Sequence, residues 1–162
     1  LEGEKRNYQS TSDVSKTILG KQQWEWLERT FQESADIIIL VSSIQILATN
    51  HGFEKWSNFP HEKERLLSLI KQFKKPVVLA SGDRHKAGIY KQGNLYELTS
   101  SSLNKPLPRW VVAVWNETDP LLLGKMHYDM NYGLISINSS GTVNIDLKDD
   151  KGNVLEAVEF DL

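Results

Sequence analysis

The chain has 162 residues, 40% of them hydrophobic, which is enough for one domain with a buried core. Its 19 basic and 21 acidic side chains are mixed along the sequence, so the formal charge is −2 and no basic stripe for a nucleic acid backbone is visible. The sequence has no cysteine, which excludes disulfides, thiolate metal sites and a cysteine nucleophile. Any metal is therefore expected to bind through histidine, carboxylate, amide or water.

Residues 1–16 are polar and rich in serine and threonine, and we expect a flexible segment there. They contain no apolar run, so neither a signal peptide nor a membrane anchor is visible. Because the sequence begins with Leu-Glu instead of methionine, we expect the natural start of the protein, with any targeting signal, to lie upstream. The 162 residues together are expected to form a single domain fragment.

Two helices and two buried strands are predicted in the first half of the chain. Trp24, Leu27 and Phe31 recur at helical spacing, and a row of leucines does the same further on. Two short apolar runs are typical of strands buried on both faces of a sheet. The helices are expected at residues 20–31 and 60–73, and the strands at residues 35–41 and 76–80. Strand, helix and strand in succession predict a parallel crossover.

Beyond Gly88, short strands separated by turns favour antiparallel pairing. They are expected at residues 95–99, 110–115, 133–138, 142–147 and 154–160. Ser140-Gly141 and Lys151-Gly152 lie between the last three strands and are typical of hairpin turns. The expected fold class is therefore α/β, with a parallel β-α-β unit followed by antiparallel strands and hairpins.

The first candidate site is Ser81-Gly82-Asp83-Arg84-His85, which directly follows the strand expected at residues 76–80. In open α/β sheets, ligands bind beyond the carboxyl ends of the parallel strands. A carboxylate and an imidazole two positions apart are able to reach one metal, and Arg84 between them suits a phosphate oxygen. The same residues also fit an ordinary turn, with Asp83 capping the backbone, His85 exposed and Arg84 a solvated surface charge.

The second candidate site is the loop of residues 42–60, which follows the neighbouring strand and carries Gln45, His51, Glu54 and Trp56. We expect it to lie beside the first site. His51 suits a metal or a substrate, and it equally fits an exposed loop histidine. The sequence has no nucleophile elbow, glycine-rich phosphate loop, zinc-protease motif or dinucleotide fingerprint. Hydrolysis through a bound metal is the chemistry that remains.

Taken together, several segments resemble the PhoD-like (alkaline phosphatase D-like) metallophosphatases of the calcineurin-like phosphoesterase superfamily. They are ILGKQQWEWLE at residues 18–28, SSIQ at 42–45, EKW at 54–56, FPHEKERLL at 59–67, SGDRH at 81–85 and YELTSS at 96–101. Each is short, but their order and spacing are specific. The resemblance implies a layered αββα metallophosphoesterase fold, of which this chain is expected to form the C-terminal half.

The resemblance also implies an activity, which is hydrolysis of a small phosphomonoester or phosphodiester by a metal-activated hydroxide. His85 is the best metal ligand. Asp83, which stands where the superfamily motif Gly-His-x-His has its first histidine, is a ligand or its partner. Arg84, His51 and Gln45 are the catalytic candidates. The implied cofactor is a divalent or mixed-valence metal pair of iron, manganese, zinc or calcium.

A two-metal site needs more ligands than SGDRH supplies. The superfamily's other motifs, Asp-x-His, Gly-Asp and Asn-His-Asp, are absent downstream of His85, so they are expected upstream of Leu1. The chain alone is therefore expected to be inactive, to expose an apolar surface toward the missing N-terminal half, and to be able to self-associate. A secreted, periplasmic or membrane-anchored location follows from the resemblance only. The alternative is a non-catalytic binding or scaffold module of the same fold.

Overall fold

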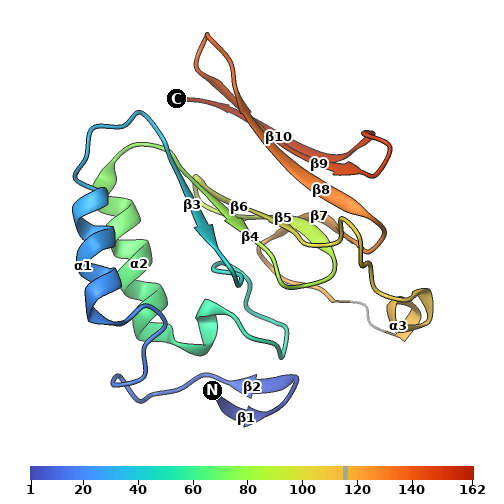
Figure 1. The fold of residues 1–162 in the computed structure, drawn as a ribbon, viewed down its shortest axis with the longest axis horizontal. Coiled ribbons are helices and arrows are strands. Elements are labelled where there is room, and N and C mark those ends of the chain that lie inside the picture. The colour runs from blue at the N-terminus through green and yellow to red at the C-terminus, as the bar shows by residue number, and fades with distance from the viewer. Residues whose placement is uncertain (115–116) are drawn as a thin grey trace.

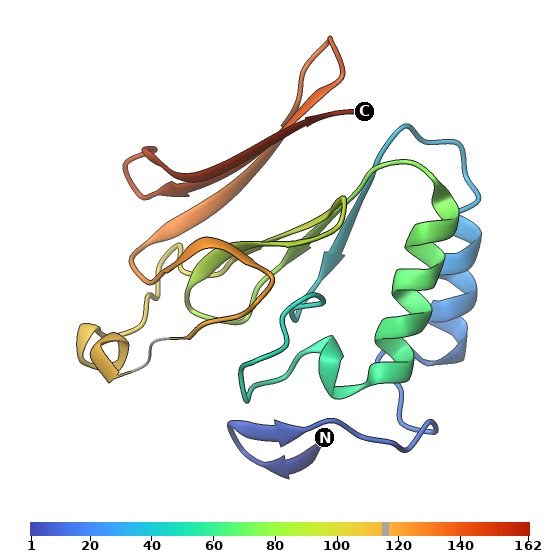
Figure 2. The same cartoon turned by 180° about the vertical axis from the view of Figure 1, so that it is seen from behind.

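The computed structural model describes residues 1–114 and 117–162, and they form three layers (Figures 1 and 2). A five-stranded sheet lies in the middle, two helices cover one of its faces and a three-stranded sheet covers part of the other. One apolar cluster fills the space between the helices and the central sheet, and a second fills the space between the two sheets. The architecture is thus mixed α/β, as the sequence predicts.

The central sheet has the strand order β3-β4-β6-β5-β7. Its strands are β3 (Ile38–Ser42), β4 (Val77–Ser81), β5 (Ala87–Gln92), β6 (Leu95–Ser100) and β7 (Leu122–His127). The first three in this order run parallel, whereas β5 is antiparallel to both of its neighbours. A helix connects β3 to β4, so the predicted parallel crossover is confirmed.

The two helices of that layer are α1 (Gly20–Thr30) and α2 (Pro60–Phe73), where the sequence predicts them. They lie side by side on one face of the sheet (Figure 1). Trp24 and Leu27 on α1 and Leu66 on α2 are buried against the sheet. The Trp24 indole N–H donates to both carboxyl oxygens of Glu62 at 3.0 Å, which joins α1 to α2. Within the described ranges, no helix is both long and apolar enough to cross a membrane.

The three-stranded sheet has the order β10-β9-β8 and is built by two hairpins. Its strands are β8 (Asn131–Ile137), β9 (Thr142–Asp149) and β10 (Val154–Asp161). The hairpin turns contain Gly141 and Gly152, whose φ angles of 90° and 87° favour glycine, so both predicted hairpins are confirmed. Every second residue of β9 between Val143 and Leu147 is fully buried and packs on the central sheet.

Several local predictions are wrong. Residues Arg109–Val114 form helix α3 where we predicted a strand at residues 110–115, and residue 115 lies outside the described part of the chain. The amides of Val111 and Val112 donate to the Pro108 carbonyl, and this local hydrogen bonding closes a helical turn in an apolar run too short to reveal its period. Strands β5 and β7 were not predicted. A short hairpin of β1 (Glu2–Glu4) and β2 (Asn7–Gln9) lies within residues 1–16, for which no strand was predicted.

The prediction that both central parallel strands are buried on two faces holds for β4 but is wrong for β3. In β4, Val77 packs toward the helices and Val78 toward the second sheet. β3 is the edge strand, and its residues Ile39 and Val41 are 44% and 75% exposed. The three-stranded sheet contacts β5 and β6 and leaves this edge uncovered. An edge of this kind is a place where further strands pair.

Core packing is tested by truncating Leu79 of β4, which is fully buried between the sheet and the helices. We expect Leu79→Ala to lower the free energy of unfolding by about 2–5 kcal/mol, because it removes buried methyl groups and leaves a cavity. Urea denaturation measures this. Leu103→Ala is the matched control, since Leu103 is 67% exposed, and a similar loss in both variants would contradict the described core.

Candidate functional site

The two candidate loops begin side by side at the carboxyl ends of the parallel strands. Ser42 and Ser81, the last residues of β3 and β4, are direct partners in the sheet. The loops also meet further on, where the Arg84 guanidinium carbon lies 4.6 Å from the centroid of the Phe53 ring. The expectation that the loops of residues 42–60 and 81–85 are neighbours is therefore confirmed.

Residues 82–86 alternate between inward and outward side chains as they join β4 to β5. Arg84 and Lys86 are buried, whereas Asp83 is exposed and His85 is half-buried. Asp83 and His85 have φ angles of 58° and 51°, an uncommon conformation for residues other than glycine and one that recurs at functional sites. The Ser101 hydroxyl fixes the loop, because it accepts from the Arg84 amide at 2.9 Å and donates to the Lys86 carbonyl at 3.2 Å.

The inward pair is held by one carboxylate. Arg84 Nη2 lies 2.6 Å from Glu117 Oε2, and the Lys86 ammonium binds the same oxygen. Burial lowers the pKa of Arg84 and of Lys86, and the charge of Glu117 opposes that shift in both. The interpretation of Arg84 as a solvated surface charge is therefore wrong. Its contact with a phosphate stays a prediction.

The outward pair partly fits a metal site. His85 Nδ1 lies 2.9 Å from the Lys105 carbonyl oxygen, which only accepts, so in the neutral ring Nδ1 carries the proton and Nε2 carries the lone pair. Metal-binding histidines usually have this arrangement. In residues 1–114 and 117–162, no three His, Cys, Asp or Glu side chains gather to hold a metal ion. Asp83 and His85 therefore fit as one part of a metal site that needs further donors.

The loop after β3 is anchored by Glu97, a buried residue of β6. Its carboxylate accepts hydrogen bonds from the Ser81 hydroxyl at 2.6 Å and from the amides of Ile46 and Leu47 at 2.8 and 2.5 Å. Burial raises the pKa of Glu97, and the hydrogen bonds from Ser81 and the backbone oppose that rise. Glu97 thus joins the loop, β4 and β6 at the edge where the candidate site lies.

Gln45 lies beneath that loop, not on its surface. Its side chain is only 1% exposed, and its amide nitrogen donates to the Thr99 hydroxyl of β6 at 2.9 Å. The side-chain oxygen Oε1 of Gln45 is buried and has no hydrogen-bond partner in the described part of the chain. The contact made by Gln45 is with the sheet, so its predicted catalytic role stays a prediction.

His51 is 7% exposed, and the interpretation of it as an exposed loop histidine is wrong. Its Nδ1 accepts a hydrogen bond from the Phe53 amide at 3.2 Å. Burial, together with the nearby positive charges of Arg84, Lys55 and Lys86, lowers the pKa of His51 to about 2. His51 is therefore neutral at ordinary pH.

Sequence reasoning missed the residues that hold the site together, namely Lys55, Lys86, Glu97, Ser101 and Glu117. A signal for Glu97 exists, because a carboxylate inside the apolar strand Tyr96-Glu97-Leu98 requires buried partners. Glu117 has no such signal, since it stands 33 residues after Arg84 in an irregular segment.

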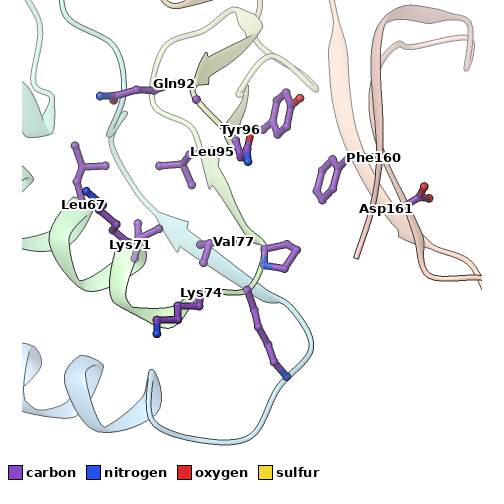
Figure 3. A pocket seen from close by; sticks show the side chains of 14 residues that line it. Leu67, Lys71, Lys74, Val77, Gln92, Leu95, Tyr96, Phe160 and Asp161 are labelled. Atoms are coloured by element: carbon purple, nitrogen blue, oxygen red, sulfur yellow. The ribbon is translucent and has the colours of Figure 1, made fainter.

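A groove of about 860 Å³ lies at the other end of the sheet (Figure 3). It is lined by Val77 and Leu95, the first residues of β4 and β6, and by Tyr96, whose ring stacks on that of Phe160 with the centroids 5.4 Å apart. None of the candidate site residues lines it. This groove is therefore separate from the candidate site.

Comparison with known protein families assigns the chain to one of them. The model of the PhoD-like phosphatases matches residues 2–153. The chain belongs to the PhoD-like phosphatase family. The resemblance of the sequence segments is thus confirmed. No curated protein sequence matches the chain.

Solved structures of related folds agree with this assignment. GAP50, described as the anchor in the inner membrane complex of Plasmodium, aligns with a TM-score of 0.68 at 15% identity, over 87% of this chain and 42% of that one. PhoD aligns with a TM-score of 0.64 at 18% identity, over 94% and 34%. The purple acid phosphatase PPD1 from yellow lupin (Lupinus luteus) seeds gives 0.63 at 11% identity, over 88% and 28%. At these identities the likeness shows the fold, and the PhoD-like chain spans less than half of each relative.

The buried His51 predicts a pH dependence of stability. Its folded pKa of about 2 lies below the ordinary value of 6.5. Above pH 6.5 His51 is neutral in both the folded and the unfolded chain, so it does not lower the free energy of unfolding there. As the pH falls below 6.5, the unfolded chain gains a proton that the fold excludes, which costs up to about 1.4 kcal/mol per pH unit. Urea denaturation between pH 7 and pH 4 should show a shallower loss in His51→Gln than in the native sequence. Equal slopes would contradict a buried, neutral His51.

Proposed function

We propose that this chain supplies the His85 side of the metal centre in a phosphoesterase that hydrolyses small phosphate monoesters or diesters. The observation that carries the proposal is the His85 ring, whose Nδ1–H donates to Lys105 O and whose Nε2 lone pair is left for a metal, beside the exposed Asp83. A bound metal pair supplies activation of water at neutral pH and polarisation of the phosphoryl group. Family membership and the phosphatase neighbours support this assignment.

In this proposal, each chain residue has a defined task. Asp83 and His85 hold metal from the outward side of the loop. Arg84 approaches phosphate through the N–H groups that Glu117 leaves free, and its Nε is buried without a partner among the described residues. His51 donates a hydrogen bond as a neutral imidazole. Gln45 acts indirectly, by fixing the loop of His51 on β6.

The rest of the metal centre is proposed to come from the N-terminal half of the same domain. The exposed edge strand β3, with Ile39 and Val41, supports this, because further strands would pair there and cover apolar surface. The solved relatives are more than twice the length that this chain matches. On this proposal the chain alone is inactive. In the absence of the N-terminal half, the edge strand β3 would instead pair with β3 of a second copy of the chain.

A non-catalytic role is the second candidate. One structural relative is described as an anchor, which supports a binding role as the alternative. On this alternative, Asp83 and His85 form an ordinary turn. Metal would then change neither stability nor hydrolysis.

The two candidates are separated with the longest natural chain that contains these residues. Loaded with Mn²⁺ or Zn²⁺, it should hydrolyse p-nitrophenyl phosphate, and His85→Ala should lower kcat/KM by at least about 100-fold because a metal ligand is lost. His61→Ala is the control, since His61 contacts the Lys16 carbonyl at the start of α2. Undiminished hydrolysis by His85→Ala would sink the assignment. No hydrolysis and no thermal stabilisation by metal would favour the non-catalytic module.

A further inference from the structure

The groove of about 860 Å³ lies at the end of the central sheet opposite to the candidate site, where β4 and β6 begin (Figure 3). Its volume is within the range of about 300–1,000 Å³ that is usual for sites of small organic molecules. Its apolar lining comes from both core clusters, and the residues are Leu67, Ile70, Val77, Leu95, Tyr96 and Phe160. An apolar ligand would therefore close both layers of the core at this end.

Two cations stand at one end of the groove, where α2 ends. Lys71 lies in the last turn of α2 and Lys74 directly follows the helix; both are exposed, and neither forms an ion pair with a described residue. The neighbouring Lys75 differs, because its ammonium binds the Ala35 carbonyl at 2.7 Å and the Asp36 carboxylate at 3.2 Å. The carboxyl end of a helix carries about half a negative charge, which offsets less than one ammonium group. This end of the groove therefore keeps a net positive charge.

The opposite end of the groove has no such excess of charge. Asp161 of β10 lines it and lies across from Lys71 and Lys74 in Figure 3. The Lys91 ammonium, 4.9 Å from the centroid of the Tyr96 ring, balances that carboxylate nearby. An anionic group is therefore attracted to the α2 end, and an apolar chain attached to it would extend over the floor toward Tyr96.

The floor of the groove offers side chains and not free backbone groups. β4 is paired with β3 and β6, and β6 is paired with β4 and β5, so neither strand has a free edge. The groove also meets these strands at their first residues, Val77 and Leu95. A polypeptide is thus unable to extend the sheet here, and the apolar floor with its cationic end decides what binds.

We propose that this groove binds a single amphiphilic anion, which is an aliphatic chain with a carboxylate or phosphate head. The chain covers the apolar floor, and the head pairs with Lys71 and Lys74. A sugar or another polar molecule would leave the floor exposed to water, and a cationic head would be repelled by the lysines. The site is separate from the metal loop, so this inference does not rest on the phosphoesterase proposal.

The test uses decanoate as the probe, below its critical micelle concentration, with the longest natural chain that contains these residues. Isothermal titration calorimetry near neutral pH should show saturable binding. Octanoate has two methylene groups fewer and should bind about fifteenfold more weakly, because each buried methylene contributes about fourfold to the affinity. Decyltrimethylammonium has the same chain and a cationic head, and it should bind at least about tenfold more weakly than decanoate.

The deciding variant combines Lys71→Glu with Lys74→Glu, two exposed positions at which the fold should tolerate the change. It should weaken decanoate binding by at least about tenfold and strengthen decyltrimethylammonium binding, because the charge at the α2 end is reversed. Lys5→Glu with Lys21→Glu is the matched control. It changes the net charge equally at exposed residues that do not line the groove, and its affinity for decanoate should stay within about twofold of the native value.

Absence of decanoate binding, or equal weakening in the two double variants, would overturn the proposal. Binding to vesicles of anionic lipid without binding of dispersed decanoate would assign the lysines to a membrane surface and would also contradict it. A dimer that dissociates in the variant of Lys71 and Lys74, without decanoate binding, would assign the groove to a second copy of the chain and overturn it too. None of these measurements depends on hydrolysis, so the groove and the catalytic proposal are tested separately.

Discussion

One oxygen of Glu117 binds two buried cations, Arg84 and Lys86, and the candidate site depends on this contact. A buried cation without a carboxylate costs several kcal/mol, so neither side chain is expected to turn inward alone. Because the two alternate with Asp83 and His85, their burial turns Asp83 and His85 outward. The left-handed backbone at both outward residues accompanies this alternation. The SGDRH segment, which fits a simple turn in the sequence, is thus a loop with two sides. Arg84 and Lys86 point inward and anchor it, whereas Asp83 and His85 point outward.

The second support is the strand order of the central sheet. β6 lies between β4 and β5, so it meets both ends of the SGDRH loop. Glu97 of β6 and Ser101, the residue that follows β6, supply the anchors. Glu97 holds the loop after β3, and Ser101 holds the loop after β4. The polar residues of the segment Tyr96–Ser101 therefore act as scaffold for the two loops. In the proposed function, this division of roles leaves His85 and Asp83 as the residues that hold metal.

Much of the fold could be predicted from the sequence, because α1, α2 and the apolar strands have clear periodicity. β5 was missed because Ala87-Gly88 lacks the β-branched residues of a typical strand, and a Cβ at Gly88 would stand 2.7 Å from Leu122 of β7. α3 was missed because a run of valines suits a strand until local hydrogen bonds decide otherwise. The exposure of β3 depends on which elements cover it, and sequence pattern alone does not contain that information.

The candidate site was predictable in position but not in detail. The rule for parallel strands located both loops, and the PhoD-like segments identified the family. The burial of Arg84 was hidden, since its partner Glu117 comes from a distant irregular segment. The burial of His51 was hidden too, because it follows from the packing of the loop against Arg84, Lys55 and the N-terminal hairpin.

A double-mutant cycle on Arg84 and Glu117 tests the alternating loop most directly. The free energies of unfolding of Arg84→Met, Glu117→Gln and the double variant should give a coupling energy of about 1–3 kcal/mol, because the pair is buried. The parallel cycle on Asp83→Asn and Glu117→Gln should give less than about 0.5 kcal/mol, because Asp83 faces outward. No coupling between Arg84 and Glu117, or equal coupling in the two cycles, would contradict the account.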